Sequence, residues 1–113
     1  MKVLIVEDDE NVRYLLARAA RQAQLVPIEA SDGEDAINKL RLIKGIRAIV
    51  TDHRMPRMTG AELLNEVTAS HPDLFRVLST NSGIIHPQAH LIRPKPQGLS
   101  MFREIHTHLQ KNS

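Results

Sequence analysis

Residues 48–60 read Ala48-Ile49-Val50-Thr51-Asp52-His53-Arg54-Met55-Pro56-Arg57-Met58-Thr59-Gly60. The run 46–50 is short, β-branched and apolar on both alternating faces apart from Arg47, which is typical of a strand buried on both sides of a parallel sheet. Pro56 cannot continue a hydrogen-bonded ladder, so the strand is expected to end near Asp52. Asp52 is therefore expected at the carboxyl end of a central strand, the edge where open α/β sheets bind their ligands.

Two further apolar runs also end in charged residues. Glu7-Asp8-Asp9 follows the run 3–6, and Lys95-Pro96 follows the run 91–92. The carboxyl ends of parallel strands share one edge of a sheet, so several carboxylates and one ammonium are expected to converge there. An acidic residue that merely begins a loop is the plain alternative for Asp52, and these two clusters count against it.

Apolar periodicity predicts strands that alternate with helices along the chain. The predicted strands cover 2–6, 25–30, 46–52, 74–80 and 89–93, and the predicted helices cover 12–23, the segment between the turn 31–33 and Gly45, 60–70 and 99–110. Asp9 or Asn11 is expected to cap the first helix, and Ser31 or Asp32 the second. The alternation predicts an α/β fold with a parallel sheet, in which Pro27 places its strand at an edge.

The connection 81–88, between the last two predicted strands, is unusually short. A parallel crossover commonly takes a dozen or more residues and includes a helix. Gly83 and Pro87 limit any helix in this connection further. We therefore expect the crossover helix to be absent or reduced to a single turn.

Composition bounds the class of protein. With 113 residues, of which 42% are hydrophobic and 25% charged, the chain is expected to form one globular domain over 1–113. The formal net charge of +2 is too mild to indicate nucleic-acid binding. The absence of cysteine excludes disulfides, thiolate zinc sites and a cysteine nucleophile, and is compatible with a cytoplasmic location. No apolar run approaches the ~20 residues that span a membrane, and the first run is followed by acids, unlike a signal peptide.

Taken together, these segments resemble a response-regulator receiver (CheY-like) domain of two-component signalling, from Lys2 to Gln110. The resemblance rests on Val-Leu-Ile-Val-Glu-Asp-Asp at 3–9, Ala-Ser-Asp-Gly-Glu-Asp-Ala at 30–36, Asp-x-x-Met-Pro-x-Met-x-Gly at 52–60 and Lys-Pro at 95–96. The motif at 52–60 is the most specific of the four. The resemblance implies a flavodoxin-like, doubly wound, five-stranded sheet in the order 2-1-3-4-5, here with its fourth helix absent or very short.

The resemblance also implies a role for each charged residue at the expected edge. Asp52 is the phosphoacceptor, and Lys95 pairs with a phosphoryl oxygen. The Mg²⁺ ligands are Asp8 directly, Glu7 mostly through water, Asp52, and the backbone carbonyl of Arg54. This set agrees with the chemistry, because phosphoryl transfer needs an acceptor oxygen and counter-charges, and Mg²⁺ prefers one or two carboxylates and keeps several waters.

A hydroxyl at the end of the 74–80 strand normally bonds the phosphoryl group in this family. Thr80 aligns best with that position and Ser79 is the alternative; the two side chains point to opposite faces of the strand, so only one can serve. Asp9 is expected to point away from the site, and Lys95-Pro96 to be a cis peptide.

Departures from the family pattern affect its usual signalling surface. Ile92 stands where an aromatic residue is common, the adjoining helix is missing, and Pro94 directly precedes Lys95. These departures motivate the alternative of an atypical pseudo-receiver, which would bind a partner independently of phosphorylation.

The primary expectation is a signalling domain that is not an enzyme. It takes a phosphoryl group from a histidine kinase or phosphotransfer protein and acts on a downstream protein partner, without binding nucleic acid or membrane; whether it forms a homodimer stays open. A phosphatase using Asp52 lacks a second acid where Arg54 stands. The six histidines, which include His86, His90, His106 and His108, are expected to be surface residues and not metal ligands.

Overall fold

The fold is a five-stranded parallel sheet with helices on both faces, as seen in a computed structural model that describes residues 1–81, 83, 85–95 and 98–112. The strand order is β2-β1-β3-β4-β5, and every pairing is parallel. The strands are β1 (Lys2–Val6), β2 (Val26–Ala30), β3 (Ile46–Asp52), β4 (Phe75–Ser79) and β5 (Leu91–Arg93). The predicted fold class and strand order are confirmed.

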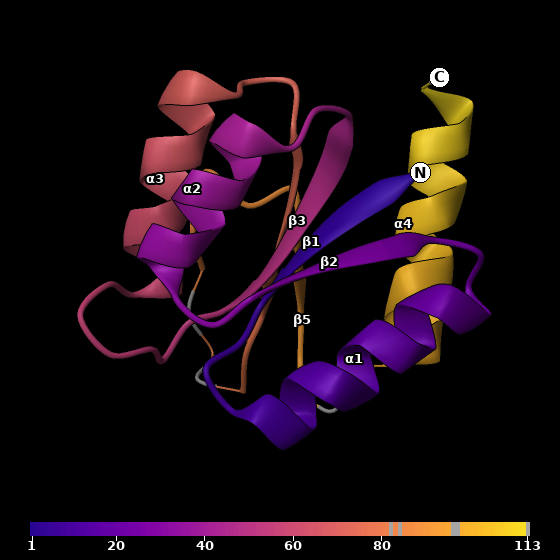
Figure 1. The fold of residues 1–113 in the computed structure, drawn as a ribbon, viewed down its shortest axis with the longest axis horizontal. Coiled ribbons are helices and arrows are strands. Elements are labelled where there is room, and N and C mark those ends of the chain that lie inside the picture. Colours follow the sequence, from indigo (N-terminus) through magenta and orange to yellow (C-terminus); the bar gives the residue numbers. More distant parts are fainter. Residues whose placement is uncertain (82, 84, 96–97, 113) are drawn as a thin grey trace.

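Helices cover the two faces of the sheet in pairs, as Figure 1 shows. The helices are α1 (Glu10–Gln22), α2 (Gly33–Leu42), α3 (Gly60–Ser70) and α4 (Leu99–Lys111). One core cluster joins α1 and α4 to the sheet around Phe102, and the other joins α2 and α3 to the opposite face around Leu64. Two separate cores of this kind define a three-layered, doubly wound domain.

Side-chain caps begin the three helices that follow β1, β2 and β3. Asp9 caps α1 by accepting from the amides of Asn11 and Val12, and Asp32 caps α2. Thr59 and Glu62 form a reciprocal capping box at the start of α3. Of the alternatives that the sequence left open, the structure thus selects Asp9 over Asn11 for α1 and Asp32 over Ser31 for α2.

The connection between β4 and β5 contains no helix among its described residues, as the sequence predicts. β5 is shorter than predicted, because pairing at its start is irregular: the Arg76 amide donates to the His90 ring at Nδ1, 3.0 Å away, and the His90 amide donates to the Arg76 carbonyl at 2.8 Å. A side chain therefore replaces one backbone rung, and the regular ladder begins only at Leu91.

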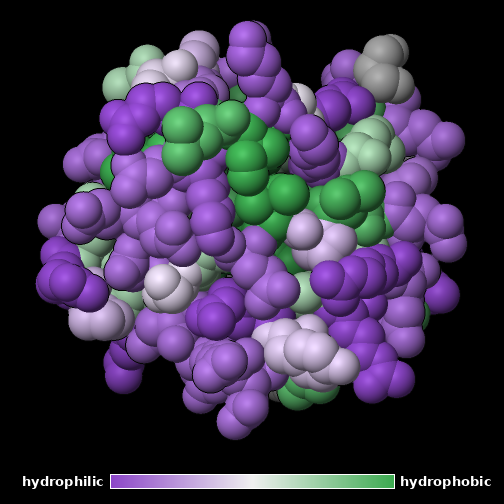
Figure 2. Space-filling view, in the orientation of Figure 1, coloured by the Kyte–Doolittle hydropathy of each residue, from purple (hydrophilic) through white to green (hydrophobic). Residues whose placement is uncertain are grey.

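Hydrophobic surface is sparse on the face drawn in Figure 2, except for one area over the α2–β3 connection and the amino ends of the strands. Val26 and Leu42 are among the large apolar residues that stay exposed. This area lies away from the carboxyl ends of the strands, where Asp52 is found. None of the helices in the described part of the chain is both long and apolar enough to span a bilayer.

Candidate functional site

Three carboxylates meet at the carboxyl ends of β1 and β3. Glu7 and Asp8 follow β1 directly, and Asp52 ends β3; one carboxylate oxygen from each lies within 4.8 Å of the others. The neighbouring strands bring them together, because Val6 pairs with Thr51 in the ladder between β1 and β3. The convergence that the sequence predicts is therefore present in the structure.

Lys95 reaches this cluster from the loop after β5. Its Nζ lies 2.9 Å from Asp52 Oδ2 and 3.0 Å from Glu7 Oε1, so one ammonium bridges two of the three carboxylates. Pro94 does not displace it. The predicted cis bond to Pro96 lies outside the described residues.

Burial and charge shift two pKa values in the site. Burial raises the pKa of the Glu7 carboxyl, and hydrogen bonds from the Asp9 amide and the Lys95 ammonium offset only part of that rise. Partial burial alone would lower the pKa of Lys95, but the hydrogen bonds and charges of Asp52 and Glu7 outweigh it and leave that pKa above its ordinary value. Lys95 is thus held as a cation, while Glu7 is a carboxylate in an unfavourable setting that a further cation would relieve.

Backbone contacts fix the conformation of Glu7. The Asp9 amide donates to Glu7 Oε2 at 3.1 Å, and the Arg13 guanidinium donates to the Glu7 carbonyl at 2.9 Å while pairing with Glu29. The side chain of Asp9 itself caps α1, and so it points away from the cluster as expected. Arg13 could not be identified from the sequence, where its only signal is its place one turn into the helix that follows the acids.

A small cavity opens beside Asp52 and has a volume of about 280 Å³. Its lining residues are Asp52, Arg54, Thr80, Asn81 and Lys95. Thr80 lines this cavity and Ser79 does not, although both residues are buried. Ser79 is the ladder partner of Asp52, whereas Thr80 is the hydroxyl residue that lines the cavity. Asn81 was not identified from the sequence.

The donor set suits a hard divalent cation. All candidate ligands of the acidic cluster are carboxylate oxygens, which Mg²⁺ prefers, and the cluster offers neither nitrogen nor sulfur. Three carboxylates against one ammonium also leave net negative charge there. The residues present thus fit Mg²⁺, with Asp8 as the most exposed of the three.

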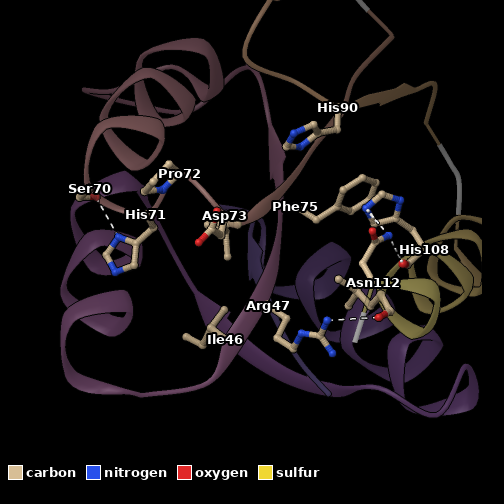
Figure 3. Close-up of a pocket in the computed structure, with 12 residues that line it drawn as sticks. Ile46, Arg47, Ser70, His71, Pro72, Asp73, Phe75, His90, His108 and Asn112 are labelled. Atoms are coloured by element: carbon tan, nitrogen blue, oxygen red, sulfur yellow. Dashed lines mark hydrogen bonds between the residues drawn. The ribbon is translucent and has the colours of Figure 1, made fainter.

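A larger hollow of about 850 Å³ lies at the other edge of the sheet, near the amino ends of β3 and β4. Figure 3 shows its histidines: His90 and His108 lie beside Phe75, with ring centroids 5.2 and 3.9 Å from it, and His71 lies apart. Burial, followed by the charges of Arg76 and His108, lowers the pKa of His90. Within the described residues, the acidic cluster is the only group of three potential metal ligands close enough to share an ion.

Comparison with known proteins agrees with this fold and site. The response regulator receiver domain family matches residues 3–92, and the chain belongs to that family. Sensor kinase CckA of Brucella abortus is 36% identical over 73 residues, which are 64% of this chain and 8% of that protein. The DNA-binding transcriptional regulator NtrC of Escherichia coli is 32% identical over 78 residues, 69% of this chain and 16% of that protein. The chain thus corresponds to a small part of these relatives.

Solved structures resemble the chain over nearly its whole length. A response regulator receiver domain protein from Clostridium thermocellum superposes with a TM-score of 0.85 at 18% identity, covering 97% of this chain and 96% of that one. The receiver domain of hybrid histidine kinase CckA gives 0.79 at 25% identity, covering 96% and 97%. Response regulator TrrA of Thermotoga maritima, solved in complex with Mg(2+)-BeF, gives 0.80 at 23% identity, covering 97% and 96%.

Proposed function

We propose that this receiver domain accepts a phosphoryl group on Asp52, in a Mg²⁺-dependent reaction, from a histidine kinase or phosphotransfer protein. The observation that carries the proposal is the Lys95 ammonium, 2.9 Å from Asp52 Oδ2 and 3.0 Å from Glu7 Oε1, beside a cluster that includes Asp8. An acceptor oxygen, a cation and a set of hard metal ligands are thus adjacent.

In this reaction an Asp52 carboxylate oxygen attacks the phosphorus of the donor. A P–O bond forms, and the P–N bond to the donor histidine breaks with the electron pair staying on the imidazole. Mg²⁺ held by Glu7, Asp8, Asp52 and the Arg54 carbonyl would neutralise charge on the phosphoryl oxygens. Lys95 then exchanges its bond to Asp52 for one to a phosphoryl oxygen, and the Thr80 hydroxyl donates to another.

The fold of TrrA, which has been solved with Mg(2+)-BeF, is shared by this chain and supports the proposed magnesium site. The proposal treats residues 1–113 as one cytoplasmic receiver domain that is not an enzyme and passes its state to a downstream protein partner. The relatives include a sensor kinase and a DNA-binding transcriptional regulator, which are proteins of different kinds.

Incubation with acetyl phosphate and Mg²⁺, followed by intact-mass measurement, tests the acceptor role. The expected result is a gain of one phosphoryl group by the wild type, and none by Asp52→Asn or after chelation of the metal. No gain by the wild type, or an equal gain by Asp52→Asn, would contradict the proposal.

A second candidate function is that of a pseudo-receiver, which binds its partner whether or not Asp52 is modified. Two observations favour it: the described part of the β4–β5 connection has no helix, and Ile92 stands where an aromatic side chain is common in the family. Binding of a captured partner by Asp52→Asn and by phosphorylated wild type separates the two functions. Equal affinities support the pseudo-receiver, and a sharp rise on phosphorylation excludes it.

A further inference from the structure

The regular pairing of β5 with β4 ends at Arg93, two residues before Lys95. The ladder with β4 stops at the pair Ser79 and Arg93, and one more backbone bond follows, from the Thr80 amide to the Arg93 carbonyl at 2.9 Å. In a continuing parallel ladder, the amide two positions further, that of Lys95, would bond the adjacent strand. Pro94 intervenes and fixes the backbone direction at this point.

The Lys95 amide donates to the side chain of Asn81. The nitrogen lies 2.6 Å from Asn81 Oδ1, across 14 positions of sequence. Asn81 directly follows Thr80, so its side-chain carbonyl accepts the hydrogen bond that a backbone carbonyl of β4 would accept in a continuing ladder. It also lines the cavity beside Asp52. The bond therefore joins the loop after β4 to the loop after β5 at the rim of the acidic site.

The bond between Lys95 and Asn81 matters because no crossover helix supports the described part of the β4–β5 connection. Gly83 and Ile85 in that connection are exposed. Lys95 must nevertheless place its ammonium within hydrogen-bond distance of both Asp52 and Glu7. A long, flexible side chain can do so reliably only if its backbone is held in place.

We propose that Asn81 is a positioning residue, whose side-chain carbonyl holds the Lys95 backbone so that the ammonium lies over Asp52 and Glu7. The inference rests on the phosphoacceptor function proposed above and adds to it a residue that acts through Lys95 and does not itself touch the phosphoryl group. In this chain, one side-chain hydrogen bond takes over part of the task of a packed crossover helix.

The rate of phosphorylation by acetyl phosphate at saturating Mg²⁺ tests this role in three variants. Asn81→Leu keeps the approximate size of the side chain but removes the acceptor, and the expected rate is about five- to tenfold lower, the value of one hydrogen bond. Asn81→Asp keeps an acceptor oxygen but adds a negative charge to the cavity beside Asp52, so its rate is expected to lie between those of Asn81→Leu and wild type. Ile85→Ser, at an exposed position of the same connection, is the matched control and should not change the rate.

Amide hydrogen exchange of Lys95, followed by NMR in the unphosphorylated protein, tests the contact separately from the chemistry. Exchange at Lys95 should be faster in Asn81→Leu than in wild type and Ile85→Ser, and this result does not depend on whether Asp52 accepts a phosphoryl group. The inference is overturned if exchange at Lys95 is unchanged in Asn81→Leu. It is equally overturned if wild type is phosphorylated on Asp52 and Asn81→Leu matches its rate, or if Asn81→Leu and Asn81→Asp are slowed alike.

Discussion

Gly60 shows how a single residue shapes the loop that follows Asp52. A Cβ at this position would lie 2.3 Å from the Asp52 carbonyl oxygen and 2.9 Å from the His53 Cα, both of them backbone atoms. The Gly60 amide also donates to the His53 carbonyl at 2.9 Å, which folds the start of α3 back against the end of β3. The glycine of the 52–60 motif is thus required by close approach of the chain to its own backbone.

Gly60→Ala is expected to destabilise the protein by about 2 kcal/mol, because backbone cannot move aside as a side chain can. Gly33→Ala is the matched control, since Gly33 also begins a helix and the three atoms nearest to its added Cβ all belong to the Met58 side chain, with the sulfur 2.5 Å away. That flexible side chain can shift, so the expected cost is below about 1 kcal/mol. Urea unfolding of both variants gives the comparison, and equal losses would contradict the explanation.

Glu7 is expected to lower stability at neutral pH when no divalent cation is bound. Its pKa is above the ordinary value of 4.5 in the folded protein, mainly through burial, so the folded state binds a proton more readily than the unfolded state. Stability therefore falls as the pH rises from 4.5 through the raised value. Glu7→Gln removes this titration.

In the presence of a chelator, Glu7→Gln should unfold at a higher urea concentration than wild type at neutral pH. Below the ordinary carboxyl pKa, where Glu7 is protonated in both states, the two proteins should unfold at similar concentrations. A wild type that is the more stable of the two at neutral pH would mean that the Lys95 contact outweighs burial.

At the scale of elements, the β4–β5 connection is held by a buried arginine in place of a helix. Arg76 of β4 is 7% exposed, and its guanidinium donates to the carbonyls of Gln88 at 2.7 Å and of Pro72 and Leu74 at 3.0 Å. No salt bridge to Arg76 occurs among residues that the structure describes. Its hydrogen bonds therefore fasten the connection to the loop before β4.

Arg76→Met keeps a long side chain but leaves these carbonyls without their donor, and the expected loss of stability is about 2–4 kcal/mol. Amide exchange should also become faster across 85–90. Arg93→Met is the control, because it removes a partly exposed ion pair with Glu104 and one hydrogen bond to the neighbouring Ile92 carbonyl, for which the expected cost is about 1 kcal/mol. If both variants lose the same small amount in urea unfolding, Arg76 does not fasten the connection.

Elements could be predicted where one local signal dominates. The alternation of strands and helices, the Pro27 edge strand and the shortened connection follow from period, proline and length, and the structure bears them out. The strand order, which the structure also confirms, was implied by the family resemblance. The start of β5 could not be predicted, because it depends on the His90 ring accepting from the Arg76 amide. Asn81 and Arg13 were missed for the same reason: a polar residue in a loop or on a helix gives no signal of its distant partner.

At the scale of the whole molecule, the acidic edge ties together segments that are far apart in sequence. Glu7 and Asp8 follow β1, Asp52 ends β3, and Lys95 follows β5, so the site exists only when the sheet is assembled. A cation bound there has no comparable site in the unfolded chain. Binding must therefore stabilise the entire fold, and the coupling can be measured without any phosphoryl donor.

Mg²⁺ at about a hundred times its dissociation constant is expected to raise the free energy of unfolding by about 2.7 kcal/mol. Asp8→Asn should abolish most of this gain, since the exposed carboxylate of the cluster is then lost. Asp9→Asn is the matched control, because it removes the same charge from the adjacent residue. Asparagine still caps α1, so the Mg²⁺ effect should persist. Urea unfolding with and without Mg²⁺ measures all three proteins. The ion is not held by this cluster if the gain survives in Asp8→Asn, or if it disappears equally in both variants. General screening depends on net charge, which both variants change alike, whereas coordination depends on which carboxylate remains.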